Sequence, residues 1–92
     1  LKRSPELSNT QGLLDRSIAL LRANGVEVDT FRLVDHEVAP GVMPDMREEG
    51  WPADAWPTLW PRIAEADILI IGSPIWLGEQ SSVTRRLIER LY

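Results

Sequence analysis

The stretch ADILIIGSPIW, residues 66–76, decides the fold of this chain. Its apolar run, residues 68–71, has the length of a β-strand and no polar face. Such a run is typical of a strand covered on both sides in a parallel α/β sheet. The turn that follows contains Gly72, Ser73 and Pro74 and leads to an apolar Trp76. This combination predicts a loop that is shaped to hold a ligand as well as to connect two elements.

A helix is predicted near the start of the chain. Leu14, Ile18 and Leu21 recur at helical spacing. Residues 8–10 are all of N-cap types, and Asn24-Gly25 is typical of a helix C-terminus. The pattern therefore predicts a polar loop over residues 1–9 and a helix over about 10–24.

The rest of the chain alternates strand and helix patterns. Residues 26–33 predict an edge strand, because their apolar and polar residues alternate at first and then lose the alternation. A Pro/Gly-rich acidic loop over about 34–54 and a short helix around 57–65 come before the strand at 67–72. An amphipathic helix follows the loop at 72–82.

This order predicts a doubly wound parallel sheet with helices on both faces. Such sheets bind ligands beyond the carboxyl ends of their strands. The loop at 72–82 follows a strand directly, and the loop at 1–9 would follow a strand that is missing from the chain. We therefore expect both loops to lie at the same end of the sheet.

Composition limits the classes of partner. The chain has 92 residues, a net charge of −4 and no cysteine. These values predict one small domain over residues 1–92, without disulfides or cysteine-ligated metals, in a cytoplasmic setting. Nucleic acid and anionic membranes are disfavoured as partners, and no segment reaches the length of a membrane span. Because the chain begins at Leu1 and ends at Tyr92 inside a helical pattern, we expect a fragment cut at both ends.

The loop KRSPELSNT, residues 2–10, combines features that suit a phosphate. It enters a helix N-terminus, which offers free backbone N–H groups and the positive end of the helix dipole. Lys2 and Arg3 add charge, while hydroxyl and amide side chains add hydrogen bonds. The loop is not a Walker motif, because the glycine-lysine pattern is absent. A capping residue in a solvated polar loop explains the same residues without a ligand.

The loop GSPIWLGEQSS, residues 72–82, suits a flat ring. Ile75 and Trp76 offer apolar surface, and the backbone N–H groups of residues 75–78 could meet the polar edge of such a ring. A plain connection between strand and helix, with Trp76 at an interface, is the alternative.

The remaining candidate residues, outside the two loops, give weaker signals of a functional site. His36 is the only histidine and is expected in a solvated loop, and residues 35–37 lack the spacing of a metal site. Residues 51–61 hold three Trp-Pro pairs, which we expect to cover the sheet or a dimer face rather than to stack on a cofactor. No side chain is predicted to act as a catalytic acid, base or nucleophile.

The two loops, in this order and at this spacing, resemble those of the flavodoxin-like NAD(P)H-dependent FMN reductases. The resemblance covers essentially the whole chain. It implies a flavodoxin-like fold of three α/β/α layers, incomplete here, with FMN as cofactor and NAD(P)H as co-substrate. Its implied FMN-phosphate ligands are Arg3, Ser4, Ser8, Asn9 and Thr10, beside Lys2. Its implied ring contacts are Ser73, Pro74, Ile75, Trp76, Leu77 and Gly78.

The family's sheet order, 2-1-3-4-5, also implies what the chain lacks. Residues 26–33 would be the second strand and 67–72 the third, so the first strand, which lies between them, would be missing. The fourth and fifth strands would be missing as well. The resemblance therefore implies an open slot in the sheet and poor folding unless another segment fills it.

The resemblance implies an oxidoreductase that passes a hydride from NAD(P)H to FMN and then to a small acceptor such as a quinone or free flavin. A homodimer is implied for the full-length protein. The alternatives are a flavodoxin-type electron carrier without nicotinamide activity, a receiver-like regulatory domain and a non-functional fragment. The loop SPELSNT differs from the compact phosphate loop of the carriers, and the acidity is modest, which favours the reductase.

Overall fold

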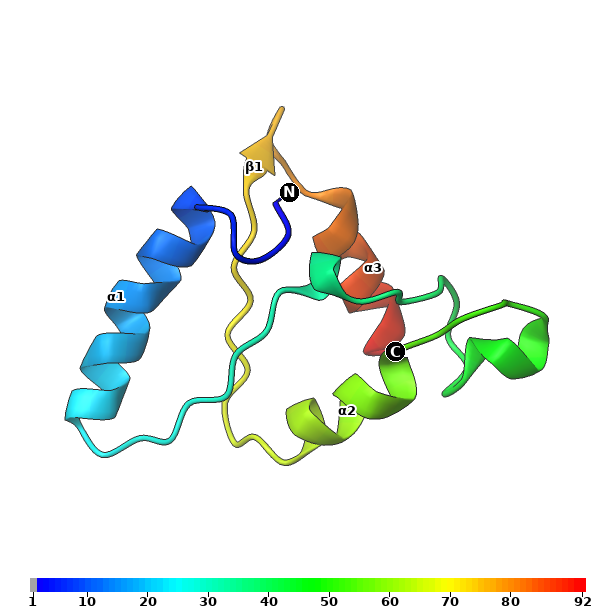
Figure 1. Cartoon of the computed structure of the whole chain (residues 1–92), viewed down its shortest axis with the longest axis horizontal. Coiled ribbons are helices and arrows are strands. Elements are labelled where there is room, and N and C mark those ends of the chain that lie inside the picture. Colours follow the sequence, from blue (N-terminus) through cyan, green and yellow to red (C-terminus); the bar gives the residue numbers. More distant parts are fainter. Residues whose placement is uncertain (1) are drawn as a thin grey trace.

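The computed structural model describes residues 2–92 of the chain (Figure 1). The first helix, α1, spans Asn9–Ala23, in agreement with the predicted helix over about 10–24. The Ser8 side chain accepts a hydrogen bond from the Gln11 backbone N–H at 3.2 Å and so caps the helix start. Gly25 follows the C-cap with a φ of 79°, which glycine adopts without steric cost.

Two shorter helices follow, and both confirm predicted helices. Helix α2 spans Trp56–Ala64 and has a proline in its first turn, where the missing N–H costs nothing. Helix α3 spans Ser82–Arg90, and the Ser81 side chain caps it by accepting from the Thr84 N–H at 3.1 Å. Two 3₁₀ turns, η1 over Leu33–Asp35 and η2 over Met46–Glu49, lie in the segment predicted as an acidic loop.

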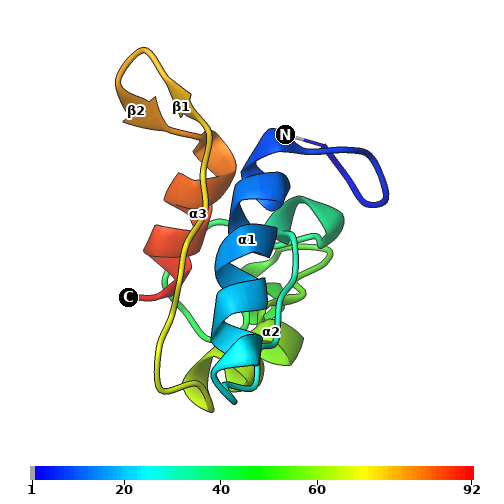
Figure 2. The same ribbon diagram turned by 90° about the vertical axis from the view of Figure 1, so that its left-hand side faces the viewer.

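The strands differ from the prediction. Strands β1, Ile75–Trp76, and β2, Glu79–Gln80, pair antiparallel and form a small hairpin that the sequence did not predict. The stretches 26–33 and 67–72 are drawn out and run in the same direction, but no backbone ladder joins them (Figures 1 and 2). The parallel sheet expected from these two stretches is therefore not formed among residues 2–92.

The apolar run at 68–71 was predicted to be covered on both faces, and the structure leaves it exposed instead. All four of its side chains are exposed, and Ile68 reaches 72 %. Helix α1 does approach the end of this run, because a Cβ on Gly72 would lie 2.6 Å from a methyl carbon of Leu14. The run thus has a helix beside it but no neighbouring strand within residues 2–92, which explains why a strand-like sequence stays exposed.

The core lies between α2, α3 and the segment 31–38. Val38, Trp56 and Leu59 are buried together. Partly buried apolar side chains pack around them: Phe31, Leu33, Ala55, Ile63, Leu87 and Leu91. Trp60 stacks on Trp56 with ring centroids 6.0 Å apart and stays partly exposed. One part of the Trp-Pro segment therefore builds the core. Of the helices formed within residues 2–92, none has the length and apolar character needed to cross a lipid bilayer.

Candidate functional site

Both candidate loops lie at the same end of the molecule. The loop before α1 and the β1–β2 hairpin are at the top of Figures 1 and 2. A cavity of about 680 Å³ opens between the elements that carry them. Ser8, Asn9 and Thr10 line it from one loop, and Pro74 lines it from the other. The structure thus brings part of each predicted ligand set to the border of one cavity.

The loop before α1 is anchored by two residues that the sequence analysis did not assign to it. Asp35 accepts hydrogen bonds from the Ser4 backbone N–H at 2.8 Å and from the Ser4 hydroxyl at 2.7 Å. The Arg32 guanidinium donates to the carbonyl oxygens of Lys2 and Glu6, at 3.2 and 2.8 Å. Ser4 is therefore already hydrogen-bonded to another residue of the chain at the surface, and its predicted role as a phosphate ligand competes with this contact.

The Ser4 hydrogen bonds lower the pKa of the Asp35 carboxyl below its ordinary value of 3.8, with a smaller contribution from nearby Arg32. A carboxyl whose pKa is lower in the folded state stabilises the fold above its ordinary pKa. That contribution is lost as the pH falls below 3.8 toward the folded-state pKa. The anchoring of the loop to Asp35 should therefore hold at neutral pH and weaken only in this acidic range.

We expect Ser4→Ala to raise the Asp35 pKa back toward 3.8, because the mutation removes the hydroxyl donor, the largest cause of the shift. A carboxyl-carbon NMR titration between pH 2 and 6 measures this directly. Ser17→Ala, at an exposed serine in the middle of α1 that lines the cavity, is the matched control and should leave the Asp35 pKa unchanged. An unchanged pKa in Ser4→Ala would contradict the assigned hydrogen bond.

The start of α1 presents backbone N–H groups at the cavity border. The first N–H groups of a helix have no acceptor inside the helix, and the helix dipole adds partial positive charge there. Ser8 caps one of them through Gln11, while Asn9 is exposed and Thr10 is partly buried. Arg3 is also exposed. This arrangement can hold an anion, and it can equally be a solvated helix start.

The β1–β2 hairpin places apolar side chains at its tip. Ile75, Trp76 and Leu77 are exposed, and the Leu77 side chain has essentially no neighbours at 105 % exposure. Leu77 and Gly78 have φ values of 52° and 79°, the pair of positive values that a two-residue type I′ hairpin turn requires. Leucine is disfavoured in this conformation, so the turn presents an apolar side chain at some conformational cost.

The base of the hairpin is held by hydroxyl groups. The Ser73 hydroxyl donates to the Pro74 carbonyl at 2.8 Å and accepts from the Ser81 N–H at 3.1 Å. Ser81 is buried and its hydroxyl lies 3.0 Å from that of Thr84. Ser73 therefore joins the two ends of the hairpin, and this gives it a structural role beside its predicted ligand role.

Two other predictions concern polar residues. His36 is partly buried and its ring meets Phe31 edge-on with centroids 5.8 Å apart, so it is not simply solvated as expected. Within residues 2–92 the structure contains no group of three or more acidic, histidine or cysteine side chains arranged to bind a metal ion.

The most buried charged pair was not found from the sequence. Asp54 and Arg90 form a salt bridge at 2.8 Å, and both side chains are fully buried. The Asp54 carboxylate also accepts from the backbone N–H groups of Ala39, Met46 and Trp56. The sequence signal is weak: Asp54 stands two residues before the start of α2, and Arg90 lies among apolar positions of α3.

Comparisons with known proteins confirm the family resemblance. Residues 3–92 match the model of the family described as NADPH-dependent FMN reductase. The chain is 37 % identical over 98 residues to the 8-demethyl-8-aminoriboflavin-5'-phosphate synthase of Streptomyces davaonensis, a match that covers 99 % of the chain and 37 % of that protein.

A second relative is named as a transporter and not as a flavin-related protein. The chain is 59 % identical over 92 residues to the divalent metal cation transporter MntH of Mycobacterium bovis, and the match covers 100 % of the chain but 14 % of that protein. The chain thus spans well under two thirds of either relative, and most of the transporter lies outside the match. No solved structure matches the chain.

Proposed function

Because this chain belongs to the NADPH-dependent FMN reductase family, we propose that it provides an FMN site for a flavin-dependent oxidoreductase. The phosphate of FMN would bind at the start of α1, with Ser8, Asn9, Thr10 and Arg3 as ligands. The ring system would lie against the hairpin tip, residues 74–78. The single observation that carries this proposal is the cavity that Ser8, Asn9 and Thr10 line from one loop and Pro74, at the base of the hairpin, lines from the other.

The chemistry of the donors fits FMN. A phosphate needs N–H and hydroxyl donors with positive charge, and the start of α1 supplies all three. A flat ring with a polar edge needs apolar surface next to backbone N–H groups. Ile75, Trp76 and Leu77 are exposed and supply the apolar surface, and the N–H groups of turn residues 77–78, outside the β1–β2 pairs, would be the donors. The bound flavin would accept the hydride, while this chain's residues position it and set its surroundings.

The proposal extends to NAD(P)H as hydride donor, to a quinone or free flavin as acceptor, and to a cytoplasmic homodimer as the working form of the whole protein. The family supports the first of these. Exposed Trp51 and Trp60 leave apolar surface for a dimer contact.

A second candidate function is the modification of a bound flavin phosphate. The Streptomyces davaonensis relative is named as a synthase of a riboflavin-5'-phosphate derivative. Both candidates require the same phosphate and ring contacts, so they share the first test. Oxidation of NADPH by the FMN-loaded protein, followed by absorbance, would favour the reductase, whereas bound FMN without NADPH oxidation would favour the synthase or the electron carrier.

The test of the site is a pair of fluorescence titrations, one with FMN and one with riboflavin, which lacks the phosphate. Asn9→Ala leaves the Ser8 cap in place, so it should weaken FMN binding about tenfold and leave riboflavin binding unchanged. Leu77→Asn suits the left-handed turn but removes apolar surface, so it should weaken both ligands alike.

Thr58→Ala, an exposed hydroxyl on α2 away from both loops, is the control and should change neither affinity. If the folded protein binds neither flavin, or if Asn9→Ala weakens riboflavin as much as FMN, the assignment of the two loops fails.

A further inference from the structure

The loop before α1 takes its shape from two side chains of another segment. The side chains of residues 2–7 are all exposed, so packing does not fix them. In the part of the chain that the structure describes, the hydrogen bonds that join these residues to another element all come from Arg32 and Asp35. One further bond, from the Glu6 N–H to the Arg3 carbonyl at 3.0 Å, closes a turn inside the loop. The conformation of the loop therefore depends on Arg32 and Asp35.

This pair of side chains is itself held next to the core. Arg32 precedes the 3₁₀ turn η1 and Asp35 ends it, and the Asp35 N–H donates to the Arg32 carbonyl at 3.0 Å. Leu33, which lies between them, packs against the buried core cluster. Arg32 and Asp35 therefore connect an exposed loop to the buried part of the molecule.

The contacts of the pair are spread over the whole turn of the loop. Asp35 holds the middle, because it accepts from the Ser4 N–H at 2.8 Å and from the Ser4 hydroxyl at 2.7 Å. Arg32 holds both sides, because its guanidinium donates to the carbonyls of Lys2 and Glu6 at 3.2 and 2.8 Å. The backbone is thus fixed before, at and after Ser4.

The charge of Asp35 does not suit direct contact with a phosphate. A carboxylate repels a phosphate, and this carboxylate also occupies two donors of Ser4 that a phosphate could use. By charge alone, Asp35 would weaken an anion site in this loop. Its contacts have another use, which is to set the path of the backbone between Arg3 and the start of α1.

We propose that Asp35, together with Arg32, is a positioning residue of the FMN-phosphate site. The two side chains hold the loop so that Arg3 and the first turn of α1 face the same phosphate, and Asp35 does not touch the phosphate itself. A loop that is ordered before the ligand arrives loses less conformational freedom on binding. This role rests on the proposed function and adds to it a segment, residues 32–35, with no ligand role of its own.

The sign of a mutational effect separates positioning from charge. In titrations followed by flavin fluorescence, Asp35→Ala should weaken FMN binding about fivefold, because hydrogen bonds to a charged group are lost. Riboflavin, which lacks the phosphate, should bind as before. An effect of charge alone would have the opposite sign, since removal of a carboxylate would tighten FMN binding.

The conservative variant Asp35→Asn should restore most of the FMN affinity. Its amide oxygen can accept from the Ser4 N–H, and its amide nitrogen can donate to the Ser4 hydroxyl. Asp35→Asn lacks the charge just as Asp35→Ala does, so a recovery in this variant alone identifies the hydrogen bonds as the cause.

A measurement on the flavin-free protein tests the same contacts without the cofactor. Amide hydrogen exchange followed by NMR should show that Ser4 and Glu6 lose protection in Asp35→Ala, because the loop is less ordered. Arg32→Met keeps most of the aliphatic chain but removes the donors to both carbonyls, and it should have the same effect on exchange.

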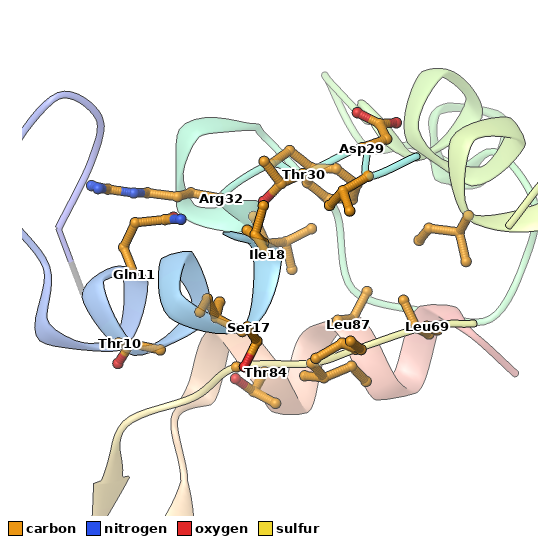
Figure 3. A pocket seen from close by; sticks show the side chains of 18 of the residues that line it. Thr10, Gln11, Ser17, Ile18, Asp29, Thr30, Arg32, Leu69, Thr84 and Leu87 are labelled. Carbon is orange, nitrogen blue, oxygen red and sulfur yellow. The ribbon is translucent and has the colours of Figure 1, made fainter. Parts of the chain in front are cut away.

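The matched control is Asp29→Ala, on the same stretch of the chain. It also removes an exposed carboxylate that is hydrogen-bonded to an arginine, since Asp29 accepts from the Arg62 Nε–H at 2.8 Å. Figure 3 shows the Arg32 side chain directed toward the end of the cavity where Thr10 lies, whereas Asp29 lies at the other end. Asp29→Ala should change neither the FMN affinity nor the exchange of the loop amides.

The outcomes distinguish this role from the flavin site on which it rests. If the unmodified protein binds neither flavin, the site fails and the positioning role fails with it. If that protein binds FMN and Asp35→Ala binds it as tightly or more tightly, only the positioning role is overturned. Equal weakening of FMN and riboflavin, or a similar loss in Asp29→Ala, would show a general loss of structure and would also overturn it.

Discussion

Asp54→Ala is expected to lower the free energy of unfolding by about 3–5 kcal/mol, the cost of breaking a buried ion pair. The mutation leaves the fully buried Arg90 guanidinium without its carboxylate partner. Two nitrogens of that group, Nε and Nη1, already have no hydrogen-bond partner among residues 2–92. The same mutation also removes the acceptor of three backbone N–H groups, at Ala39, Met46 and Trp56. Urea denaturation followed by circular dichroism measures the change.

The matched control is Glu79→Ala, which breaks an exposed pair with Arg85 at 3.2 Å. Exposed pairs contribute little, so this change should stay within about 0.5 kcal/mol. Adding Arg90→Met to Asp54→Ala should recover part of the loss, because it removes the unpaired buried charge. Equal effects of Asp54→Ala and Glu79→Ala would show that the buried pair does not form.

Leu59→Ala is expected to cost about 2–5 kcal/mol, because it leaves a cavity beside Val38 and Trp56. Leu59 has an exposed fraction of 1 %. That loss is a large part of the total stability of a small domain, which is about 5–15 kcal/mol. Thermal and urea denaturation should both show it.

Leu20→Ala serves as the control for Leu59→Ala, since the same side chain is removed at a position of α1 that is 68 % exposed. It should change the free energy of unfolding by less than about 0.5 kcal/mol. A similar loss in both variants would mean that α2 does not form the core described above.

The sequence predicted the elements that local chemistry determines. Ser8 and Asn24-Gly25 mark the ends of α1 through capping, which depends on a few neighbouring residues. Pro57 marks the start of α2 in the same local way. The loops at 2–10 and 72–82 also resembled those of a known family, and the family model that matches residues 3–92 confirms this resemblance.

The strands could not be read correctly, because a strand depends on a partner that may lie anywhere in a chain. Residues 68–71 have the composition of a covered strand, yet they stay exposed, because no strand in the described part of the chain lies beside them. The anchoring of Ser4 by Asp35 and the burial of Asp54 with Arg90 also join residues far apart in the sequence. No local pattern indicates such contacts. The positive φ of Leu77 was missed because leucine seldom occupies that conformation.

The hydroxyl bonds at the base of the hairpin have a mechanical consequence. Ser81 is bonded through its backbone to Ser73 and through its side chain to the first turn of α3. Ser81 therefore connects the hairpin directly to the helix, and no flexible linker separates β2 from α3. A tilt of the hairpin must turn the helix start with it, whereas a flexing tip must bend at Leu77 and Gly78. Flexing of the tip would therefore stay within the hairpin, whereas a tilt of its base would be passed to α3, which carries Leu87 and Leu91 beside the core.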